Sequence, residues 1–551
     1  PDKVRITDLA LDLAVDFDKR QLAGSATLTL AWADKDHRDL VLDTRDLAIG
    51  AVEARSGKRK FRPVDFTLAA RDERFGSKLT ITLPRQYEQV RITYATSPQA
   101  SGLQWLSPAM TAGGKTPFMF SQSQAIHARS WVPLQDTPSV RFTYSARIRT
   151  PADVMVLMSA DNDPAAPRDG DYSFTMPQAI PSYLMAIAAG DLAFKPISER
   201  AGVWAEPRTL DRAVKEFADT EKMIQVTEKL YGDYRWGRYD LLILPPSFPF
   251  GGMENPRLSF ITPTVIVGDG SLVSLIAHEL AHSWSGNLVT NASWKDMWLN
   301  EGFTSYVENR IVEELYGKER ADMEYVISRN GLADELAEVP EAQQVLVLPA
   351  RGGSDPEDAL GAVAYDKGAW FLQFLEQRFG REAFDPFLRS WFDTHAFQSV
   401  DSDQFAAFLR TNLMAKQPGV VTEAELAAWL TQPGIPEFAP RTTSPRFDAV
   451  DAARESWTKR RTAARDLKTS AWTTQEWVYF LEGLPADLPP ERLVELDQAF
   501  RFTGTPNGEL ATGGVIACAG LWSDRVARLT GDAGPAAPRI VPFRGDYYTL
   551  T

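Results

Sequence analysis

The chain of 551 residues has a single cysteine, Cys518, and only five histidines. One cysteine excludes a disulfide within the chain and a metal site built from several cysteines. No apolar run reaches the roughly 18 residues that a membrane-spanning helix needs, so no membrane span is expected. Acidic residues (73) outnumber basic ones (59), and the resulting net charge of −14 disfavours nucleic acid as a partner.

Core-forming side chains, in contrast, are plentiful. The hydrophobic fraction is 44%, with 15 Trp, 15 Tyr and 29 Phe, which is typical of globular proteins and excludes disorder of the whole chain. At roughly 100–200 residues per domain, the length predicts three or four domains. The sequence starts at Pro1 without a signal-like stretch, so the cytoplasm and export after removal of a leader both stay open. The oligomeric state is also left open.

Roughly the first 200 residues predict a large antiparallel β domain. Short runs with partial alternation of apolar and polar residues are separated by turn residues, which is the pattern of half-buried strands. The predicted strands are 4–14, 25–32, 40–47, 78–83, 89–95, 140–150 and 154–159.

Further along, the pattern becomes mostly helical. Residues 209–230 predict one amphipathic helix, and 240–244 predict a strand that is ended by two prolines. Helical periodicity dominates 271–407 and returns at 452–500, after a proline-rich linker at 433–440.

The strongest chemical signal is the run His278-Glu279-Leu280-Ala281-His282. Residues four apart on a helix project from the same face, so His278 and His282 can bind one zinc ion. Glu279 then lies beside the metal without binding it, where it can hold and deprotonate a water molecule. The competing interpretation is a helix with two surface histidines, which a chain with so few histidines makes less probable than a zinc site.

Acidic residues on either side extend this prediction. Eighteen residues separate the second histidine from Glu301, which can supply the third ligand of a catalytic zinc but also suits a helix N-terminus. Glu308, two turns later, can accept a hydrogen bond from a ligand imidazole or be an ordinary exposed glutamate. Upstream, Glu254 follows Gly251 and Gly252, which allow a backbone to approach a ligand closely. A carboxylate there suits the α-ammonium of a peptide, although alone it also suits an ordinary loop.

Together, residues 251–255, residues 278–282 and Glu301 resemble the zinc aminopeptidases of the gluzincin group, the aminopeptidase N family, and in particular its leukotriene-A(4) hydrolase-like members. The resemblance covers roughly residues 1–510. Supporting stretches are 101–106, 121–127, 135–139, 239–242 and 284–291.

The resemblance implies an α+β multidomain fold in three parts. These are an N-terminal antiparallel β-sheet domain at 1–205, a thermolysin-like α/β zinc peptidase domain at 206–435, and a C-terminal all-α, helical repeat-like domain at 436–551. Residues 513–551 are rich in glycine and proline and do not follow the family's helical pattern. The family's basic pair for the substrate carboxylate is not placed, with Arg539 and Arg544 as candidates.

The resemblance also implies a role for each residue of the site. His278, His282 and Glu301 hold one zinc ion per chain, and Glu279 is the general base that deprotonates the zinc-activated water. Tyr365, in a matching Tyr-Asp-Lys-Gly run, donates a hydrogen bond to the tetrahedral oxyanion. The implied activity is hydrolysis of the N-terminal peptide bond of peptides with a free N-terminus. The implied substrate-binding residues are Gln122, Gln124, Gly251, Gly252, Met253 and Glu254.

Three alternatives stay open. A leukotriene-A(4)-type epoxide hydrolase is disfavoured because the family's second tyrosine and its aspartate are replaced by Leu360 and Glu357. A thermolysin-like endopeptidase shares the zinc helix but has no need of the segment at 251–255. A non-catalytic peptide-binding module would lack a ligand or the general base, and both are present.

Overall fold

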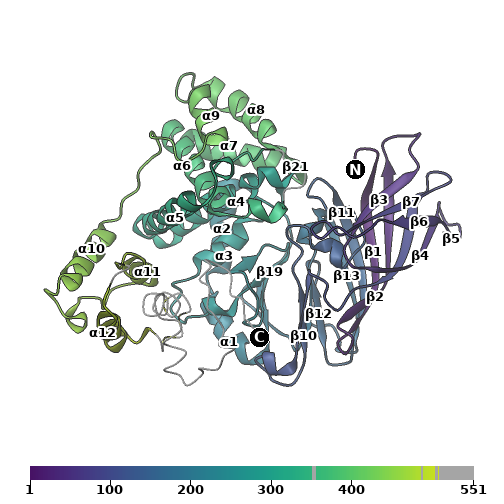
Figure 1. The fold of residues 1–551 in the computed structure, drawn as a ribbon, viewed down its shortest axis with the longest axis horizontal. Coiled ribbons are helices and arrows are strands. Elements are labelled where there is room, and N and C mark those ends of the chain that lie inside the picture. Colours follow the sequence, from purple (N-terminus) through teal and green to yellow (C-terminus); the bar gives the residue numbers. More distant parts are fainter. Residues whose placement is uncertain (350–354, 486–487, 503–504, 506, 508–509, 511–551) are drawn as a thin grey trace.

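The computed structural model describes residues 1–349, 355–485 and 488–502 together with residues 505, 507 and 510. Figure 1 shows a β-rich lobe at one end, a mixed and helical region in the middle, and the last described helices at the other end. The segment 513–551, with Arg539 and Arg544, lies outside the described residues. The three-part α+β fold expected from the sequence is confirmed for the residues described.

A seven-stranded sheet forms the outer lobe. Its strands alternate buried and exposed residues, as in β1, because one face packs on the core and the other faces solvent. Its order is β13-β11-β1-β2-β8-β4-β5, with only the β1–β11 pair parallel. The strands are β1 (Val4–Asp16), β2 (Gln21–Trp32), β4 (Ala48–Arg55), β5 (Arg62–Pro63), β8 (Gln89–Ala95), β11 (Arg141–Arg149) and β13 (Asp171–Pro181).

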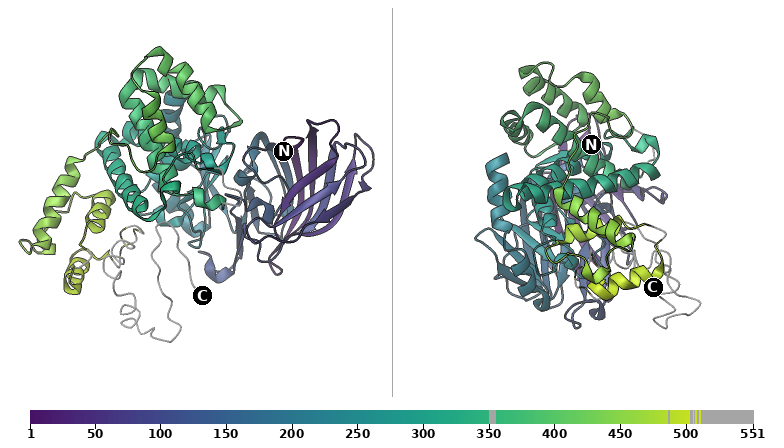
Figure 2. Two further views of the ribbon diagram at one scale, coloured as in Figure 1. Left: turned by 45° about the horizontal axis from the view of Figure 1, so that its top comes forward. Right: turned by 90° about the vertical axis from the view of Figure 1, so that its left-hand side faces the viewer.

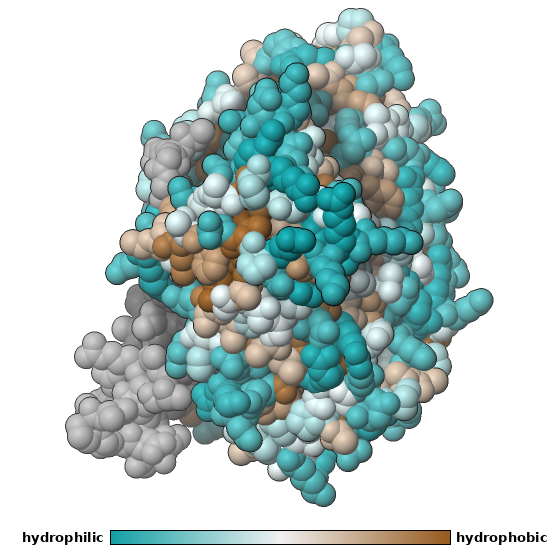
Figure 3. Space-filling model, turned by 90° about the vertical axis from the view of Figure 1, so that its right-hand side faces the viewer, coloured by the Kyte–Doolittle hydropathy of each residue, from teal (hydrophilic) through white to brown (hydrophobic). Residues whose placement is uncertain are grey.

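Two smaller sheets complete the lobe. A three-stranded sheet, β3-β7-β6, buries the leucines and isoleucine of β3 and β7, and a four-stranded sheet, β12-β14-β10-β9, has three strands that are buried along their whole length. Figure 3 shows that the outer end of the lobe is largely hydrophilic, with apolar side chains gathered near its middle. The strands are β3 (Asp39–Thr44), β6 (Asp65–Leu68), β7 (Ser77–Thr82), β9 (Leu103–Leu106), β10 (Phe118–Ser121), β12 (Met155–Met158) and β14 (Ile187–Gly190).

A five-stranded sheet begins the central region, with two strands before the predicted boundary at residue 205 and three after it. Its order is β15-β16-β17-β19-β18, and the three central strands are parallel. The predicted domain boundaries at 205 and 435 stay predictions, but the first of them divides this sheet. The strands are β15 (Ala193–Pro196), β16 (Ala201–Ala205), β17 (Tyr239–Ile243), β18 (Gly252–Met253) and β19 (Leu258–Ile261).

The prediction of a single helix over 209–230 is wrong, because the segment forms two helices. The first ends at Glu216, whose carboxylate accepts hydrogen bonds from the backbone N–H groups of Gly268 and Gly270. Phe217 is buried, and the Thr220 hydroxyl donates to its carbonyl at 2.7 Å, which favours a turn over a continuing helix.

Helices surround the sheet and fill the rest of the central region (Figures 1 and 2). The short strands β20 (Val289–Asn291) and β21 (Gln398–Val400) pair in parallel. They join the segment after α3 to the segment between α7 and α8. The helices are α1 (Pro207–Glu216), α2 (Thr220–Tyr231), α3 (Ser274–Ala281), α4 (Trp298–Tyr316), α5 (Lys318–Glu338), α6 (Gly368–Phe379), α7 (Arg381–Thr394), α8 (Ser402–Asn412) and α9 (Glu423–Thr431).

The last three described helices form a small core of their own. They are α10 (Pro445–Thr458), α11 (Thr474–Glu482) and α12 (Pro490–Phe500), and they follow the linker predicted at 433–440. Phe447, Trp457 and Phe480 are buried in this core together with Met323 of α5, so the C-terminal helices pack on the central region. Among the helices described, none is long and apolar enough to cross a membrane.

Candidate active site

The two histidines of the predicted motif point their Nε2 atoms at one another. His278 lies in the last turn of α3 and His282 is its C-terminal cap, so the spacing of four places them on one face. Their Nε2 atoms are 3.2 Å apart. His282 is almost fully buried, and His278 is partly so.

Glu301 completes this group from the first turn of α4. Its Oε2 lies 3.4 Å from the Nε2 atoms of both His278 and His282. Three ligand atoms at 2.0–2.1 Å from a tetrahedral zinc are about 3.3 Å apart, so the observed spacings fit that ion. Glu301 Oε2 is also buried without a hydrogen-bond donor among the described residues. The donor set and its geometry therefore fit a zinc ion.

The outer nitrogens of both imidazoles have acceptors that orient the rings. His278 Nδ1 lies 2.9 Å from Oε2 of Glu308, so Glu308 accepts a hydrogen bond from the imidazole and is not an ordinary exposed glutamate. His282 Nδ1 lies 3.1 Å from the Ser285 carbonyl and 3.1 Å from the Thr304 hydroxyl. A proton on each Nδ1 leaves the Nε2 lone pairs free to face a metal. Neither Thr304 nor Ser285 was predicted from the sequence as a residue of the site.

Glu279 lies beside the three ligand atoms but is separate from them. Its side chain is 4% exposed, and Oε2 has no hydrogen-bond donor among the described residues. Burial raises its pKa to about 8. A Cβ on Gly252 would lie 2.2 Å from Glu279 Oε1, so the β18 backbone passes directly against the carboxylate and only glycine leaves room for it.

Glu254 is a second buried carboxylate at the same place. One oxygen each of Glu254 and Glu279 and one nitrogen of His282 lie within 4.8 Å of one another. Glu254 Oε1 has no hydrogen-bond donor among the described residues, and burial raises the pKa of this group. Asn287 Nδ2 donates to the Glu254 carbonyl at 2.8 Å, which fixes the backbone from which the carboxylate extends.

The remaining predicted substrate-binding residues approach from the β lobe and from the sheet edge. Gln122, just beyond β10, contacts the Met253 sulfur through Nε2 at 3.2 Å. Gln122 Oε1 and Gln124 Nε2 are buried without hydrogen-bond partners among the described residues. The Gly251 carbonyl accepts the Thr262 N–H at 2.9 Å, which ties this strand to the loop after β19. Unpaired polar atoms of this kind are available to a ligand.

Tyr365 faces the metal-ligand group from a third direction. It lies in a π-helical turn, Val363–Lys367, directly before α6, and its ring stacks on that of His278 at 6.0 Å and 13°. Burial and the carboxylates of Glu301 and Glu254 hold the pKa of Tyr365 well above its ordinary value. The hydroxyl therefore keeps its proton and is a hydrogen-bond donor.

The two positions that depart from the family pattern lie on the segment before this turn. Glu357 Oε1 accepts the Ala125 N–H at 2.9 Å and lies 3.4 Å from His127 Nε2. Leu360 is partly buried and packs against the main hydrophobic core. The contact from Glu357 to Ala125, next to Gln124, joins residues more than 200 positions apart and could not be expected from spacing.

Comparison with known proteins supports the same assignment for both halves of the chain. The sequence profile of the peptidase family M1 domain matches residues 215–423, and that of the peptidase M1 N-terminal domain matches residues 6–184. Leucine aminopeptidase 2 of Yarrowia lipolytica is 42% identical over 461 residues, covering 81% of this chain and 68% of the relative. Leukotriene A-4 hydrolase of Xenopus laevis is 38% identical over 528 residues, covering 93% and 86%. The structure of yeast LTA4 hydrolase with bestatin superposes with a TM-score of 0.87 at 33% identity, covering 96% of this chain and 88% of that one.

Proposed function

The chain belongs to peptidase family M1 and is a zinc-dependent aminopeptidase, and from that premise we propose which of its residues carry out the reaction. His278, His282 and Glu301 hold the zinc ion. Glu279 is the general base and Tyr365 the oxyanion donor. The residues proposed to bind the substrate are Gln122, Gln124, Gly251, Gly252, Met253 and Glu254.

The proposed specificity for a free N-terminus rests on Glu254. A buried carboxylate without a donor is costly unless a cation or a hydrogen-bond donor reaches it. The α-ammonium of a peptide supplies both, and a carboxylate a few ångströms from the metal ligands leaves room for one residue between the ammonium and the first peptide bond. The substrates that we propose are therefore peptides with an unblocked N-terminus, cleaved after their first residue.

The chemical step that we propose is addition of water to the first peptide carbonyl. His278, His282 and Glu301 would hold the zinc ion, which when bound would polarise this carbonyl and lower the pKa of the attacking water. Glu279 accepts the proton that the water loses as its oxygen bonds to the carbonyl carbon. Tyr365 donates a hydrogen bond to the oxygen on which negative charge develops. Glu279 then gives its proton to the leaving nitrogen as the carbon–nitrogen bond breaks.

The protein's own geometry supports this division of roles. Because Gly252 has no Cβ, the β18 backbone can lie against Glu279 Oε1, while Glu279 Oε2 is buried without a hydrogen-bond donor among the described residues and is available to a water molecule. A cation beside Glu279 favours its ionised form, which offsets the effect of burial. Binding of the ammonium by Glu254 fixes the register of the substrate, so proximity contributes to the rate.

We do not extend the proposal to fatty epoxides. Leu360 has no hydroxyl, and Glu357 already accepts the Ala125 N–H and lies beside His127. Peptide hydrolysis needs neither residue.

An assay on matched substrates tests the proposal. Aminoacyl 4-nitroanilides are compared with their N-acetylated forms, each with and without a zinc chelator. We expect hydrolysis of the free forms only, abolished by the chelator and restored by zinc. Equal hydrolysis of the acetylated forms would contradict the role of Glu254, and activity that survives complete removal of metal would contradict the whole proposal.

A further inference from the structure

The turn that carries Tyr365 is hydrogen-bonded at its start to a carboxylate on another helix. At the start of a helix, the first backbone N–H groups have no acceptor within the helix itself. Here Ala362 N donates to Oε2 of Glu335 at 2.8 Å, and Val363 N points to Oε1 at 3.2 Å. Glu335 belongs to α5, so its carboxylate caps this turn from outside, where its negative charge also suits the helix dipole.

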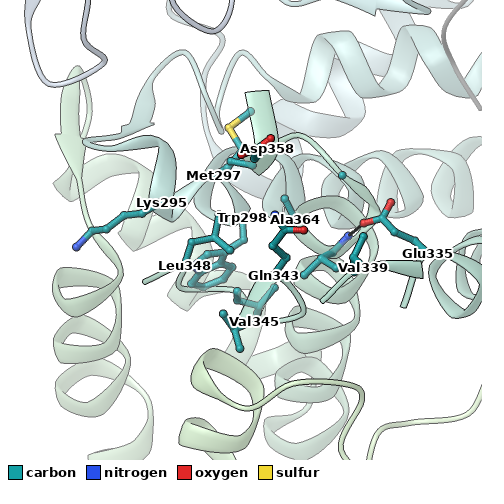
Figure 4. A pocket seen from close by; sticks show the side chains of 14 residues that line it. Lys295, Met297, Trp298, Glu335, Val339, Gln343, Val345, Leu348, Asp358 and Ala364 are labelled. Carbon is teal, nitrogen blue, oxygen red and sulfur yellow. Dashed lines mark hydrogen bonds between the residues drawn. The ribbon is translucent and has the colours of Figure 1, made fainter. Parts of the chain in front are cut away.

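The chain passes close over this carboxylate before it reaches Tyr365. A Cβ on Gly361 would lie 2.7 Å from Glu335 Oε1, so glycine permits the approach. The Gly361 carbonyl in turn accepts the N–H of Ala364 at 2.9 Å and that of Tyr365 at 3.4 Å. Glu335 and Ala364 also line the same small cavity (Figure 4). The peptide group between Gly361 and Ala362 therefore connects Glu335 to Tyr365. Its N–H donates to the Glu335 carboxylate, and its carbonyl accepts the N–H of Tyr365.

The other end of the turn is fixed by different contacts. A Cβ on Gly368 would lie 2.7 Å from the Cα of Gly302, so α6 and α4 meet backbone to backbone one residue after Glu301. Lys367 Nζ donates to the carbonyls of Gln344 and Gln432, both at 2.8 Å. These contacts hold the turn after Tyr365, and Glu335 holds it before Tyr365.

We propose that Glu335 is a positioning residue for the reaction: by capping the turn Val363–Lys367, it sets where the Tyr365 hydroxyl lies relative to the metal ligands. This inference rests on the proposed role of Tyr365. Because that hydroxyl acts on charge that develops in the transition state, loss of its position lowers kcat while KM changes little. Misplacement of a catalytic group by about 1 Å can cost about 100-fold in rate.

A double-mutant cycle in the full chain tests the inference. The variants are Glu335→Ala, Tyr365→Phe and their combination, with Glu335→Gln as the conservative variant and Glu338→Ala, an exposed position on the same helix, as the control. Each zinc-loaded protein is measured for kcat and KM on an aminoacyl 4-nitroanilide, for zinc content and for its melting temperature.

We expect Glu335→Ala to lower kcat about 10- to 100-fold with KM within about twofold of the parent. Glu335→Gln, which keeps one acceptor oxygen, should recover much of this loss, and Glu338→Ala should match the parent. In the Tyr365→Phe background, Glu335→Ala should cause no further loss. If Glu335→Ala does not fold, the same cycle with Glu335→Met, which has a similar length and no acceptor oxygen, replaces it.

Three results would overturn the inference. Unchanged kcat in Glu335→Ala would show that Glu335 does not position the site. Losses that multiply in the double variant would show that Glu335 acts by a route other than Tyr365. If Tyr365→Phe itself keeps full kcat, the role of Tyr365 under the proposed function is wrong and the positioning role falls with it.

Discussion

Lys367 provides a prediction about stability that can be worked out from its surroundings. Its side chain is completely buried, and its Nζ donates to two backbone carbonyls, those of Gln344 and Gln432. A neutral amine has two N–H groups and can satisfy both carbonyls, whereas an ammonium has a third that needs another acceptor. Burial accordingly lowers the pKa of Lys367 to about 8.

The direction of the pH effect follows from this shift. The pKa of Lys367 in the folded protein lies below its value of 10.5 in the unfolded chain, so the unfolded chain binds more protons between these values. The free energy of unfolding therefore rises with pH between about 8 and 10.5. Above pH 10.5, Lys367 adds no further rise. Between about pH 7 and about pH 10 the rise from this one group is about 2.5 kcal/mol.

The assay compares the parent protein with Lys367→Met, which has similar length and no titratable group. Urea unfolding is followed at several pH values in the same window. The variant lacks the two hydrogen bonds of Lys367 at every pH, so their loss lowers its free energy of unfolding by a constant amount. The contributions of all other titrating groups cancel in the difference between the two proteins. We expect the parent to gain about 2.5 kcal/mol relative to the variant from the lower to the upper pH. A difference that stays constant with pH would refute this account of Lys367.

Three further predictions concern the site itself. Glu279→Gln should lower kcat by about 10²–10⁴-fold while zinc content, measured by atomic absorption, stays at one per chain; near-normal turnover would remove Glu279 as the base. Glu254→Gln should cost about 2–5 kcal/mol in kcat/KM for substrates with a free N-terminus. The test is kcat/KM of the Glu254→Gln variant on free aminoacyl 4-nitroanilides, and an unchanged value would argue against an ammonium contact. Gly302→Ala places a Cβ 2.7 Å from Gly368 Cα and should cost about 1–3 kcal/mol of stability in a thermal melt. The control is Gly113→Ala, where the nearest neighbouring atom would be 3.5 Å away, and equal melting temperatures for the two variants would contradict the close helix contact.

The residues that could be predicted from the sequence are those whose relation is local. His278 and His282 are four apart on one helix, so their convergence follows from helix geometry alone. The strands of the β lobe were also predictable, because alternation along a half-buried strand is visible in the sequence. Glu301 needed the added assumption that a second helix packs on the first, which the resemblance to a family supplied.

The residues that could not be predicted act across the packing of distant elements. Thr304 and Glu335 contact their partners through neighbouring helices, and no spacing in the sequence indicates which face of a helix will meet which neighbour. Phe217 interrupts a segment whose periodicity is helical throughout, because its burial and the hydroxyl of Thr220 favour a turn there. Of the five-stranded sheet, only β17 was predicted, at 240–244, and β15, β16, β18 and β19 were not.

The most direct test of the account is a crystal structure with diffraction data collected on both sides of the zinc absorption edge. We predict one anomalous difference peak per chain, present only above the edge, in contact with Nε2 of His278, Nε2 of His282 and a carboxylate oxygen of Glu301. An active protein whose zinc peak lies elsewhere, or which shows none, would contradict the central claim that these three side chains hold the catalytic metal.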